Sequence, residues 1–354
     1  IPSDADTKRV RWVEPLLVAE IEFREWTAGG HVRHAVFLGL RLDKDPHEVT
    51  REPSGPPKPK TAKRERKQPP AAPSLKLTHL DRIYWPDAGI SKQGLIDYYV
   101  EVWDWIAPHV IDRPLALVRC PGGVGGDCFF QKHAWSGLDQ ALVHVTQIAD
   151  ESVLSISSLD GALALVQAGV IEIHPWGSRL SNPERPDRLI FDLDPGEGVT
   201  WPKVEQTAIE LRDRLRSLGL RSFAKTTGGK GLHVVIPVAP EADWETAKAF
   251  TQRLAAQMAK EAPQRFVAKM TKSIRGGRVF IDYLRNGRGA TAVAAYSPRA
   301  RPGAPVSTPL SWEELGGGIS PAHFTVANMR RRLLSLDSDP WAGIVKLKQR
   351  LPAS

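Results

Sequence analysis

The stretch that decides the fold is Arg188-Leu189-Ile190-Phe191-Asp192-Leu193-Asp194-Pro195-Gly196. Its residues alternate with a period of two, which is typical of a β-strand. On such a strand Asp192 and Asp194 share one face with Ile190, and the opposite face is wholly apolar. Two like charges on one face repel each other, and a divalent cation would relieve that repulsion. Taken alone, the stretch leaves an ordinary solvent-facing strand end equally open.

A third carboxylate, Asp282, lies in another apolar run at 278–284. The Asn286-Gly287 pair that follows is typical of a tight hairpin, so we expect 278–284 and 291–296 to form an antiparallel pair of strands. Three carboxylates on neighbouring strands could hold two metal ions about 4 Å apart, the arrangement used for in-line phosphoryl displacement. The sequence therefore predicts a metal-dependent phosphoryl-transfer site.

A glycine-rich segment, Thr227-Gly228-Gly229-Lys230-Gly231, enters a further apolar run. Adjacent glycines allow backbone N–H groups to converge on an anion, and Thr227 and Lys230 add a hydroxyl and a charge. A plain glycine-rich turn is the alternative. Basic residues also cluster around Asp282, some of them ordinary surface charges: Lys269, Lys272, Arg275, Arg278, Arg285, Arg288, Arg299 and Arg301.

From residue 75 onward the patterns of helices and strands are mixed, which indicates an α+β fold. Ser91 is typical of a helix N-cap, and Pro202 and Gly219 are typical of the start and end of another helix. We expect helices over 91–106, 201–218 and 244–260, and strands over 115–119, 188–194 and 232–238.

Residues 1–49 contain two strand-like runs, 16–23 and 31–38, separated by a turn at 27–30. They predict a β-hairpin too small to bury a core by itself. Residues 50–74 are rich in Pro, Lys and Arg, and we expect a flexible linker that could also hold DNA loosely. The main domain is then 75–354.

The formal charge of +8 favours a polyanionic partner. The two cysteines, Cys120 and Cys128, predict two ordinary thiols in a reduced, cytoplasmic protein rather than a disulfide scaffold. We see neither a secretory signal nor a membrane-spanning run, so no membrane partner is expected.

Four motifs, taken together, closely resemble the polymerase domain of bacterial ligase D, a member of the archaeo-eukaryotic primase superfamily. They are 172–176 (Glu-Ile-His-Pro-Trp), 191–196 (Phe-Asp-Leu-Asp-Pro-Gly), 227–233 (Thr-Gly-Gly-Lys-Gly-Leu-His) and 280–289 (Phe-Ile-Asp-Tyr-Leu-Arg-Asn-Gly-Arg-Gly). The resemblance implies a primase-like fold, with a mixed or antiparallel sheet flanked by helices.

The resemblance also implies a nucleotidyltransferase that fills gaps and extends 3′ ends with NTP or dNTP during bacterial non-homologous end joining. Two Mn²⁺ or Mg²⁺ ions would be bound by Asp192, Asp194 and Asp282, the catalytic triad. Thr227 stands where the family has Ser, so the hydroxyl is kept in a tighter pocket. The resemblance assigns contacts with the incoming nucleotide to His174, Thr227, Lys230, His233, Arg275, Arg285 and Arg299, and contacts with DNA to Lys92 and Lys132.

Residues 11–15 and 38–46 resemble the end of the oligonucleotide-binding fold in the ATP-dependent ligase module. No Lys-x-Asp-Gly adenylation motif occurs, so we expect no ligation by this chain alone. The implied partners are DNA with double-strand-break ends, gaps or overhangs, the rest of the ligase D polypeptide and the bacterial Ku homodimer. The implied location is the cytoplasm, with the nucleoid.

Two alternatives remain. A haloacid-dehalogenase-type phosphatase also begins its nucleophile motif with Phe-Asp-Leu-Asp, although there Gly-Thr follows instead of Pro195-Gly196, in a doubly wound domain. A non-catalytic DNA-end scaffold would bind through the basic linker and grooves, although loss of a carboxylate would then be expected.

Overall fold

The structure is a computed structural model that describes residues 19–22, 25–26, 32–33, 36–40 and 75–352. The chain divides into two compact units, Ile1–Pro69 and Pro70–Ser354. Within the described ranges, no helix combines the length and the apolar character that crossing a lipid bilayer requires.

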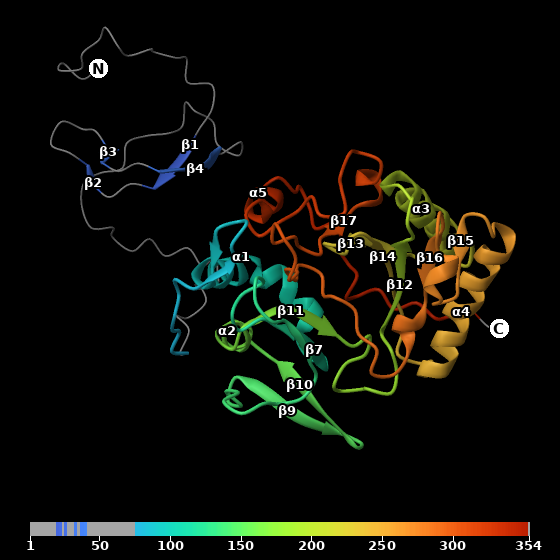
Figure 1. Ribbon diagram of the computed structural model, residues 1–354, viewed down its shortest axis with the longest axis horizontal. Coiled ribbons are helices and arrows are strands. Elements are labelled where there is room, and N and C mark those ends of the chain that lie inside the picture. Colours follow the sequence, from blue (N-terminus) through green and yellow to red (C-terminus); the bar gives the residue numbers. More distant parts are fainter. Residues whose placement is uncertain (1–18, 23–24, 27–31, 34–35, 41–74, 353–354) are drawn as a thin grey trace, which may run out of the picture. The chain divides into compact units, whose positions relative to one another are not determined.

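The first unit contains four short strands that form two antiparallel pairs (Figure 1). β1 (Ala19–Glu22) pairs with β4 (Val36–Leu40), and β2 (Glu25–Trp26) pairs with β3 (Val32–Arg33). The antiparallel pairing predicted for the two runs is therefore confirmed. The predicted turn at 27–30 and the predicted linker at 50–74 lie outside the described residues.

The second unit contains a six-stranded sheet in the order β15-β16-β12-β14-β13-β17. Its strands are β12 (Arg188–Pro195), β13 (Phe223–Thr226), β14 (Leu232–Pro237), β15 (Phe266–Val267), β16 (Val279–Asp282) and β17 (Pro309–Leu310). β12 is antiparallel to both of its neighbours, whereas the dehalogenase-type alternative requires a doubly wound parallel sheet. That alternative is therefore wrong.

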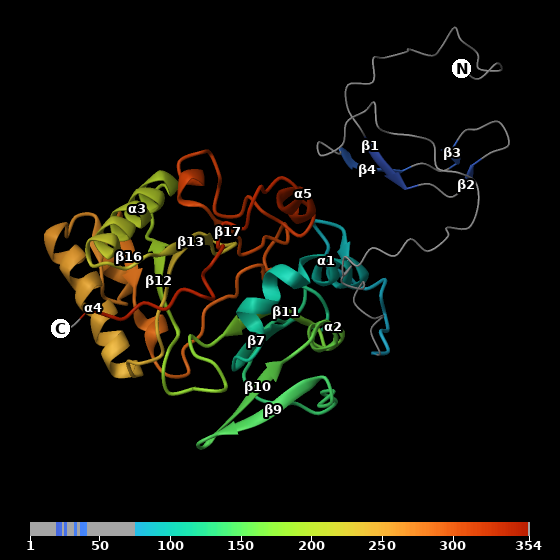
Figure 2. The same cartoon turned by 180° about the vertical axis from the view of Figure 1, so that it is seen from behind.

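The same unit has a five-stranded sheet in the order β11-β7-β10-β9, with β8 paired to β7. Its strands are β7 (Leu115–Arg119), β8 (Phe129–Gln131), β9 (Val143–Ile148), β10 (Glu151–Ile156) and β11 (Val170–Pro175). Two further short strands, β5 (Ile83–Trp85) and β6 (Ile90–Ser91), pair with each other. Figure 2 shows the β9–β10 hairpin projecting from this part of the unit.

The helices begin where their capping residues predict. α1 (Lys92–Val110) is capped by Ser91, whose Oγ accepts a hydrogen bond from Gly94 N. α3 (Trp201–Ser217) has Pro202 in its first turn, and α4 (Trp244–Glu261) is capped by Asp243. The two remaining α-helices in the described part of the chain are α2 (Leu159–Gln167) and α5 (Met329–Leu334). The three predicted helices are therefore confirmed, and α1 runs one turn further than expected.

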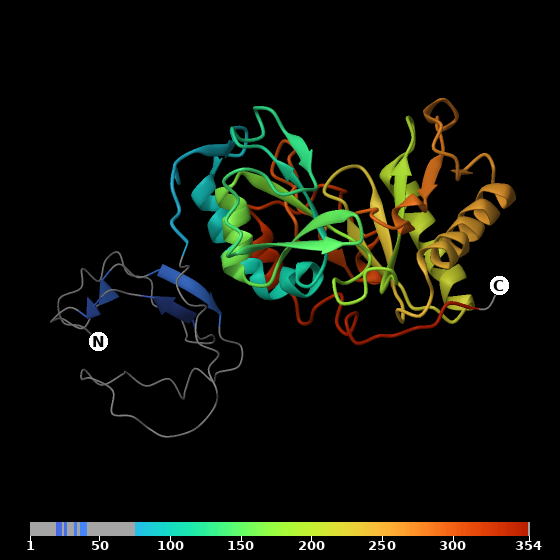
Figure 3. The same ribbon diagram turned by 90° about the horizontal axis from the view of Figure 1, so that it is seen from below.

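One hydrophobic core runs through both sheets. α1 and α2 pack with the five-stranded sheet and α3 and α4 with the six-stranded sheet, which gives the two lobes visible in Figure 3. Trp341 joins them, because its buried ring contacts His109 of α1 and Phe223 of β13 and its Nε1 donates to Ala224 O over 2.8 Å. The C-terminal segment thus holds the two lobes together.

The hairpin predicted at Asn286-Gly287 is wrong. η3 (Leu284–Asn286) is a single helical turn, and 291–296 forms only one isolated bridge, from Thr291 to Trp176. Asn286 is buried, and its side chain accepts from Ile190 N over 2.7 Å and donates to Ile190 O over 2.8 Å. The amide therefore replaces a strand partner for β12 beyond the end of β16, and Asp282 pairs with β12 instead of a hairpin partner.

The expectation of two ordinary thiols is also wrong, because Cys120 and Cys128 form a disulfide. β7 and β8 pair antiparallel with Arg119 opposite Phe129. Cys120 directly follows Arg119 and Cys128 directly precedes Phe129, so this antiparallel register places the two cysteines next to each other. The cysteine content therefore gives no support to a reduced compartment.

Candidate active site

Asp192 and Asp282 lie directly opposite each other on the paired strands β12 and β16. Both carboxylates are 6% exposed. Asp194 follows two residues later on the same face of β12, as the alternation predicts. The two acidic runs singled out from the sequence therefore belong to adjacent strands of one sheet.

Gly231 shows how close Asp192 and Asp194 lie to each other. A Cβ atom at this glycine would lie 3.4 Å from Asp192 Oδ1, 3.2 Å from Asp194 Oδ1 and 2.7 Å from Leu193 O. Any side chain here would collide with the backbone and fill the space that both carboxylates face. The glycine therefore keeps a small cradle open between the two acidic groups.

The electrostatic environments of Asp192 and Asp194 differ strongly. Burial alone would raise the pKa of Asp192, but His233 and Arg285 lower it to about 2, with their nitrogens 3.3 Å from its carboxylate. Burial, followed by repulsion from Asp192 and Asp282, raises the pKa of Asp194 to about 6. The pair therefore holds a fully ionised carboxylate beside one that titrates near neutral pH.

A divalent cation fits this acidic pair. Asp192 Oδ1 is buried and accepts no well-aligned hydrogen bond among the described residues, although His233 Nε2 lies 3.3 Å from it. Asp282 is turned towards η3, with Oδ1 accepting from Leu284 N and Oδ2 lying 3.5 Å from Arg285 Nε. Accordingly, no group of three or more His, Cys, Asp or Glu side chains closes around one point in the described part of the chain. Asp192 and Asp194 therefore provide ligands for a cation, and Asp282 adjoins them through Arg285, which contacts both Asp192 and Asp282.

The glycine-rich segment forms the loop between β13 and β14. Thr227 Oγ1 accepts from Gly229 N over 3.2 Å and donates to Gly231 O over 3.0 Å, so the hydroxyl shapes the loop itself. Gly228 has a φ of +64°, and a Cβ there would lie 2.8 Å from Arg299 Cγ. Lys230, at the tip, is exposed. The loop therefore presents a cation on a backbone that only glycine allows.

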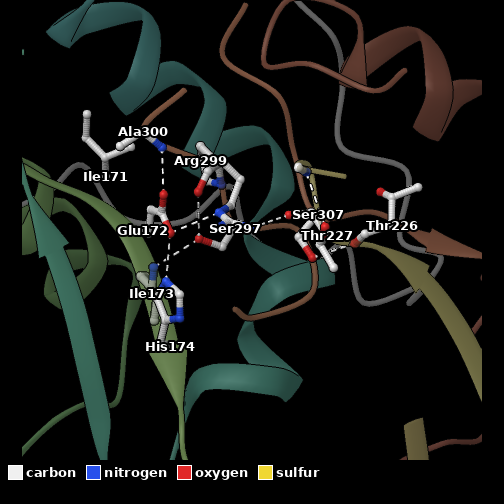
Figure 4. Close-up of polar contacts among 12 residues, drawn as sticks. Ile171, Glu172, Ile173, His174, Thr226, Thr227, Ser297, Arg299, Ala300 and Ser307 are labelled. Atoms are coloured by element: carbon white, nitrogen blue, oxygen red, sulfur yellow. Dashed lines mark hydrogen bonds and ion pairs between the residues drawn. The ribbon is translucent and has the colours of Figure 1, made fainter. Parts of the chain in front are cut away.

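Glu172 on β11 organises the opposite wall (Figure 4). Its Oε2 accepts from His174 Nε2 over 2.7 Å and from Arg299 Nε over 2.9 Å, and its Oε1 accepts from Ala300 N over 2.8 Å. Burial would raise the pKa of Glu172, but these donors lower it to about 2. Arg299 also donates to Thr227 O. An anionic Glu172 thus connects the five-stranded sheet to the glycine-rich loop.

These walls enclose a cavity of about 490 Å³. Cationic side chains outnumber the two carboxylates in its lining, which suits a polyphosphate together with a divalent cation. The predicted site residues that line it are His174, Asp192, Asp194, Thr227, Lys230, His233, Arg275, Arg285 and Arg299. Asp282 is not part of this lining, but it lies opposite Asp192 on the adjacent strand β16.

Neither residue predicted to contact DNA lines the cavity. Lys92 is 3% exposed, and its Nζ donates to Thr78 O, Gln167 O and Gln167 Oε1. Burial, and then nearby Arg82, lower the pKa of Lys92. The amine is hydrogen-bonded inside the protein, and the DNA contact expected of Lys92 stays a prediction. Lys132 is exposed, next to β8.

Two features of the site were missed from the sequence. Glu172 was not recognised as a site residue, although a carboxylate between Ile171 and Ile173 is the same signal that identified Asp192. Arg301, one of the basic residues clustered around Asp282 in the sequence, lines the cavity as well. Phe130 is 49% exposed and its ring centroid lies 5.6 Å from that of His174. An exposed aromatic ring carries no sequence signal that separates it from a core residue.

Fold and site together are those of a primase-polymerase type of domain, with paired acidic strands facing a basic, glycine-rich loop. Residues 91–341 match the family described as "LigD, primase-polymerase domain", and the chain belongs to that family. Residues 2–44 match "ATP dependent DNA ligase C terminal region". Family and fold expected from the four motifs are therefore confirmed.

The relatives are consistent with this assignment. The chain is 38% identical to the multifunctional non-homologous end joining protein LigD of Pseudomonas aeruginosa, over 100% of this chain and 43% of that protein. It is 33% identical to the corresponding protein of Mycolicibacterium smegmatis, over 68% of this chain and 32% of that protein. The chain thus spans less than half the length of these two relatives.

A solved structure agrees in fold. It is the polymerase domain from Mycobacterium tuberculosis ligase D in complex with DNA, with a TM-score of 0.71 and 30% sequence identity. The match covers 78% of this chain and 99% of that domain.

Proposed function

We propose that this chain is a DNA-directed nucleotidyltransferase that fills gaps and extends 3′ ends with NTP or dNTP during bacterial non-homologous end joining. The observation that supports this most is that Asp192 and Asp194 share one cavity with five cationic side chains, which are Lys230, Arg275, Arg285, Arg299 and Arg301. The names of the relatives and the DNA in the similar solved structure support the same process and substrate.

Two divalent cations, Mn²⁺ or Mg²⁺, would be held by Asp192 and Asp194 together with Asp282. The buried Asp192 Oδ1, which accepts no well-aligned hydrogen bond among the described residues, and the cradle kept open by Gly231 support this assignment. Cations held there would supply the positive charge that lowers the pKa of a primer 3′-hydroxyl and offsets the charge of a departing pyrophosphate.

The protein's own side chains would orient the nucleotide. Lys230 and Arg301 are exposed at the cavity and are placed to bind the triphosphate, while Glu172 fixes the guanidinium of Arg299. Because a carboxylate accepts the hydrogen on His174 Nε2, the other ring nitrogen, Nδ1, is an acceptor for a substrate hydroxyl. Phe130 offers an aromatic face on which a base can stack.

The partners and location follow from this role. DNA with broken ends, gaps or overhangs is the proposed substrate, and the bacterial Ku homodimer and the rest of a ligase D polypeptide are the proposed partners. Only the ligase C-terminal region is matched at 2–44, so we expect no ligation by this chain alone. A DNA substrate places the activity at the nucleoid, in the cytoplasm.

The direct test is primer extension on a gapped or overhanging duplex, comparing Mn²⁺ with Mg²⁺ and NTP with dNTP. Asp192→Ala should reduce extension by about 10²–10³-fold or more, because it removes a charge placed at the reacting phosphate. DNA binding, measured by fluorescence anisotropy, should stay close to that of the wild type. Asp213→Ala, on an exposed carboxylate of α3, is the matched control.

Wild-type extension by the Asp192→Ala variant would refute the assignment of this carboxylate. Wild-type protein that binds the duplex but incorporates no nucleotide with any divalent cation would instead favour a non-catalytic DNA-end scaffold.

A further inference from the structure

A second pocket lies where β12 begins and β14 ends, at the opposite end of these strands from the carboxylates. It shares no lining residue with the nucleotide cavity. Arg188 in its wall lies six residues before Asp194 on β12, a separation of about 20 Å along an extended strand. The pocket has a volume of about 160 Å³, well below the size typical of drug-like ligands. Only a small ligand fits.

The charge in this pocket is strongly unbalanced. Five cationic side chains line it against a single carboxylate: Arg113, Arg179, Arg185, Arg188 and Lys348 against Asp187.

That carboxylate is already fully used. Asp187 accepts two hydrogen bonds from Arg113, over 2.7 and 2.8 Å, and a third from Arg179 Nε over 3.1 Å. Arg179 also lies 3.8 Å from Asp112, which is outside the pocket lining. Arg185 donates to the backbone oxygen of Glu241. The acidic groups nearby therefore contact Arg113 and Arg179 directly, whereas Arg185, Arg188 and Lys348 form no ion pair among the described residues.

Arg188 is the side chain for which this imbalance matters most. It is 8% exposed, and it forms no ion pair with any carboxylate among the described residues. Its polar contact is His109 Nδ1 at 3.3 Å, and burial holds the pKa of His109 well below its usual value, so that ring is neutral. Burial, and then repulsion from Arg113, lower the pKa of Arg188 to about 9, against a smaller attraction from Asp187. A buried guanidinium without an ion pair of its own is costly.

Arg113 gives an independent sign of an incomplete site. It is 1% exposed, and its Nε is buried without a hydrogen-bond partner in the described part of the chain. Two nearly buried guanidinium groups therefore line one small pocket with more donors and more charge than the protein satisfies.

We propose that this pocket binds a free phosphate ion. The excess of cations favours a dianion over a monovalent carboxylate, and a tetrahedral oxyanion can accept hydrogen bonds from several guanidinium groups at once. Lys348 belongs to the C-terminal segment and Arg188 to β12. A bound phosphate would therefore join that segment to the strand. This binding is independent of nucleotide addition.

The test is isothermal titration of the full 354-residue chain with sodium phosphate, at matched ionic strength in chloride. Because phosphate can also enter the nucleotide cavity, the titration is made in a Lys230→Ala/Arg301→Ala background that weakens that cavity. We expect one phosphate to bind in this background. In thermal melts, its Tm should rise with phosphate concentration.

Substitutions in the pocket locate the binding. Arg188→Met should weaken phosphate binding by about tenfold or more, the loss expected for one charge-assisted hydrogen bond. Arg185→Ala/Lys348→Ala alters exposed side chains only, so it keeps the test valid if Arg188→Met does not fold, and it should weaken binding severalfold. Lys346→Ala, an exposed lysine two residues from Lys348 and outside the lining, is the matched control.

Three results would overturn the proposal. They are the absence of phosphate binding in the Lys230→Ala/Arg301→Ala background, binding that the pocket substitutions leave unchanged, and binding that they weaken no more than Lys346→Ala does. A pocket that takes a 5′-phosphorylated oligonucleotide but no free phosphate, in the same titration, would also refute it and would assign the site to DNA ends.

Discussion

Glu172 is the residue that ties the two walls of the cavity together. It lies on β11 of the five-stranded sheet, and through Arg299 it reaches Thr227 at the end of the six-stranded sheet. It also fixes which nitrogen of His174 carries hydrogen. Without this carboxylate His174 would lose its hydrogen-bond partner, and Arg299 would keep only its hydrogen bond to Thr227 O.

Glu172→Gln should therefore raise the KM for nucleotide by about tenfold, because Arg299 loses a charge-assisted hydrogen bond. Burial lowers the pKa of His174 and Glu172 raises it. Removing the carboxylate should then lower that pKa further and move the acidic limb of the pH–rate profile to lower pH. Steady-state extension kinetics across pH measure both effects.

Glu184→Gln is the matched control, since Glu184 is exposed and pairs with Arg288 outside the cavity. An unchanged KM and pH profile in Glu172→Gln would show that the network in Figure 4 does not position the nucleotide.

The raised pKa of Asp194 predicts that its ionisation destabilises the folded state, whereas most carboxylates in folded proteins stabilise it when ionised. Its folded-state pKa of about 6 lies above the usual aspartate pKa of 3.8, so the folded state binds more protons than the unfolded state between these values. Stability therefore falls as pH rises through this window. Without divalent cation, Asp194→Asn should raise Tm by a few degrees at pH 8 and have no effect near pH 3.

Thermal melts of both proteins, with Asp213→Asn as an exposed control, test this sign. Adding Mn²⁺ should stabilise the wild type more than the variant, because the variant has lost a ligand. A variant less stable than the wild type at pH 8 in chelator would contradict the repulsion inferred between the carboxylates.

The carboxylates could be predicted from the sequence because a charge in an apolar strand is conspicuous. The burial of Lys92 could not be predicted from the sequence, since a lysine at the start of a helix is normally solvated. Its burial depends on Thr78 and Gln167, which lie 14 and 75 residues away along the chain. Such a contact is set by tertiary packing.

At the level of elements, β12 extends beyond the end of β16, and there the side chain of Asn286 takes the place of a neighbouring strand. Asn286→Ala should reduce the free energy of unfolding by about 2–4 kcal/mol, because it leaves both the N–H and the C=O of Ile190 without partners. Urea unfolding measures the loss. Asn182→Ala is the control, since its side chain makes no hydrogen bond among the described residues; an equal loss there would contradict the role of Asn286.

The same region shows why some elements escaped prediction. Asn-Gly is a turn signal because both residues tolerate positive φ. Here the Asn286 amide instead makes the hydrogen bonds to Ile190 that a neighbouring strand would make. The hairpin of β9 and β10 was missed because β9 is exposed along its middle and so lacks an alternating apolar face. β12, with one wholly apolar face, was predicted at both ends to within one residue.

At the scale of the whole molecule, the net charge of +8 predicts a strong dependence of DNA affinity on salt. If six to ten Lys or Arg side chains contact phosphates, the affinity for a gapped duplex should fall by about 10³–10⁵-fold between 50 and 200 mM salt. Anisotropy titrations at several salt concentrations give the slope. A flat dependence would argue against a phosphate backbone as the ligand.

The cavity lies between two sheets, with its acidic floor on one and its histidine wall on the other. Its width is therefore set by how the shared core packs, including at Trp341 far from the chemistry. Substrate specificity in this domain is then partly a property of its interior: a conservative replacement deep in the core can retune which nucleotide is accepted without touching any residue that meets it.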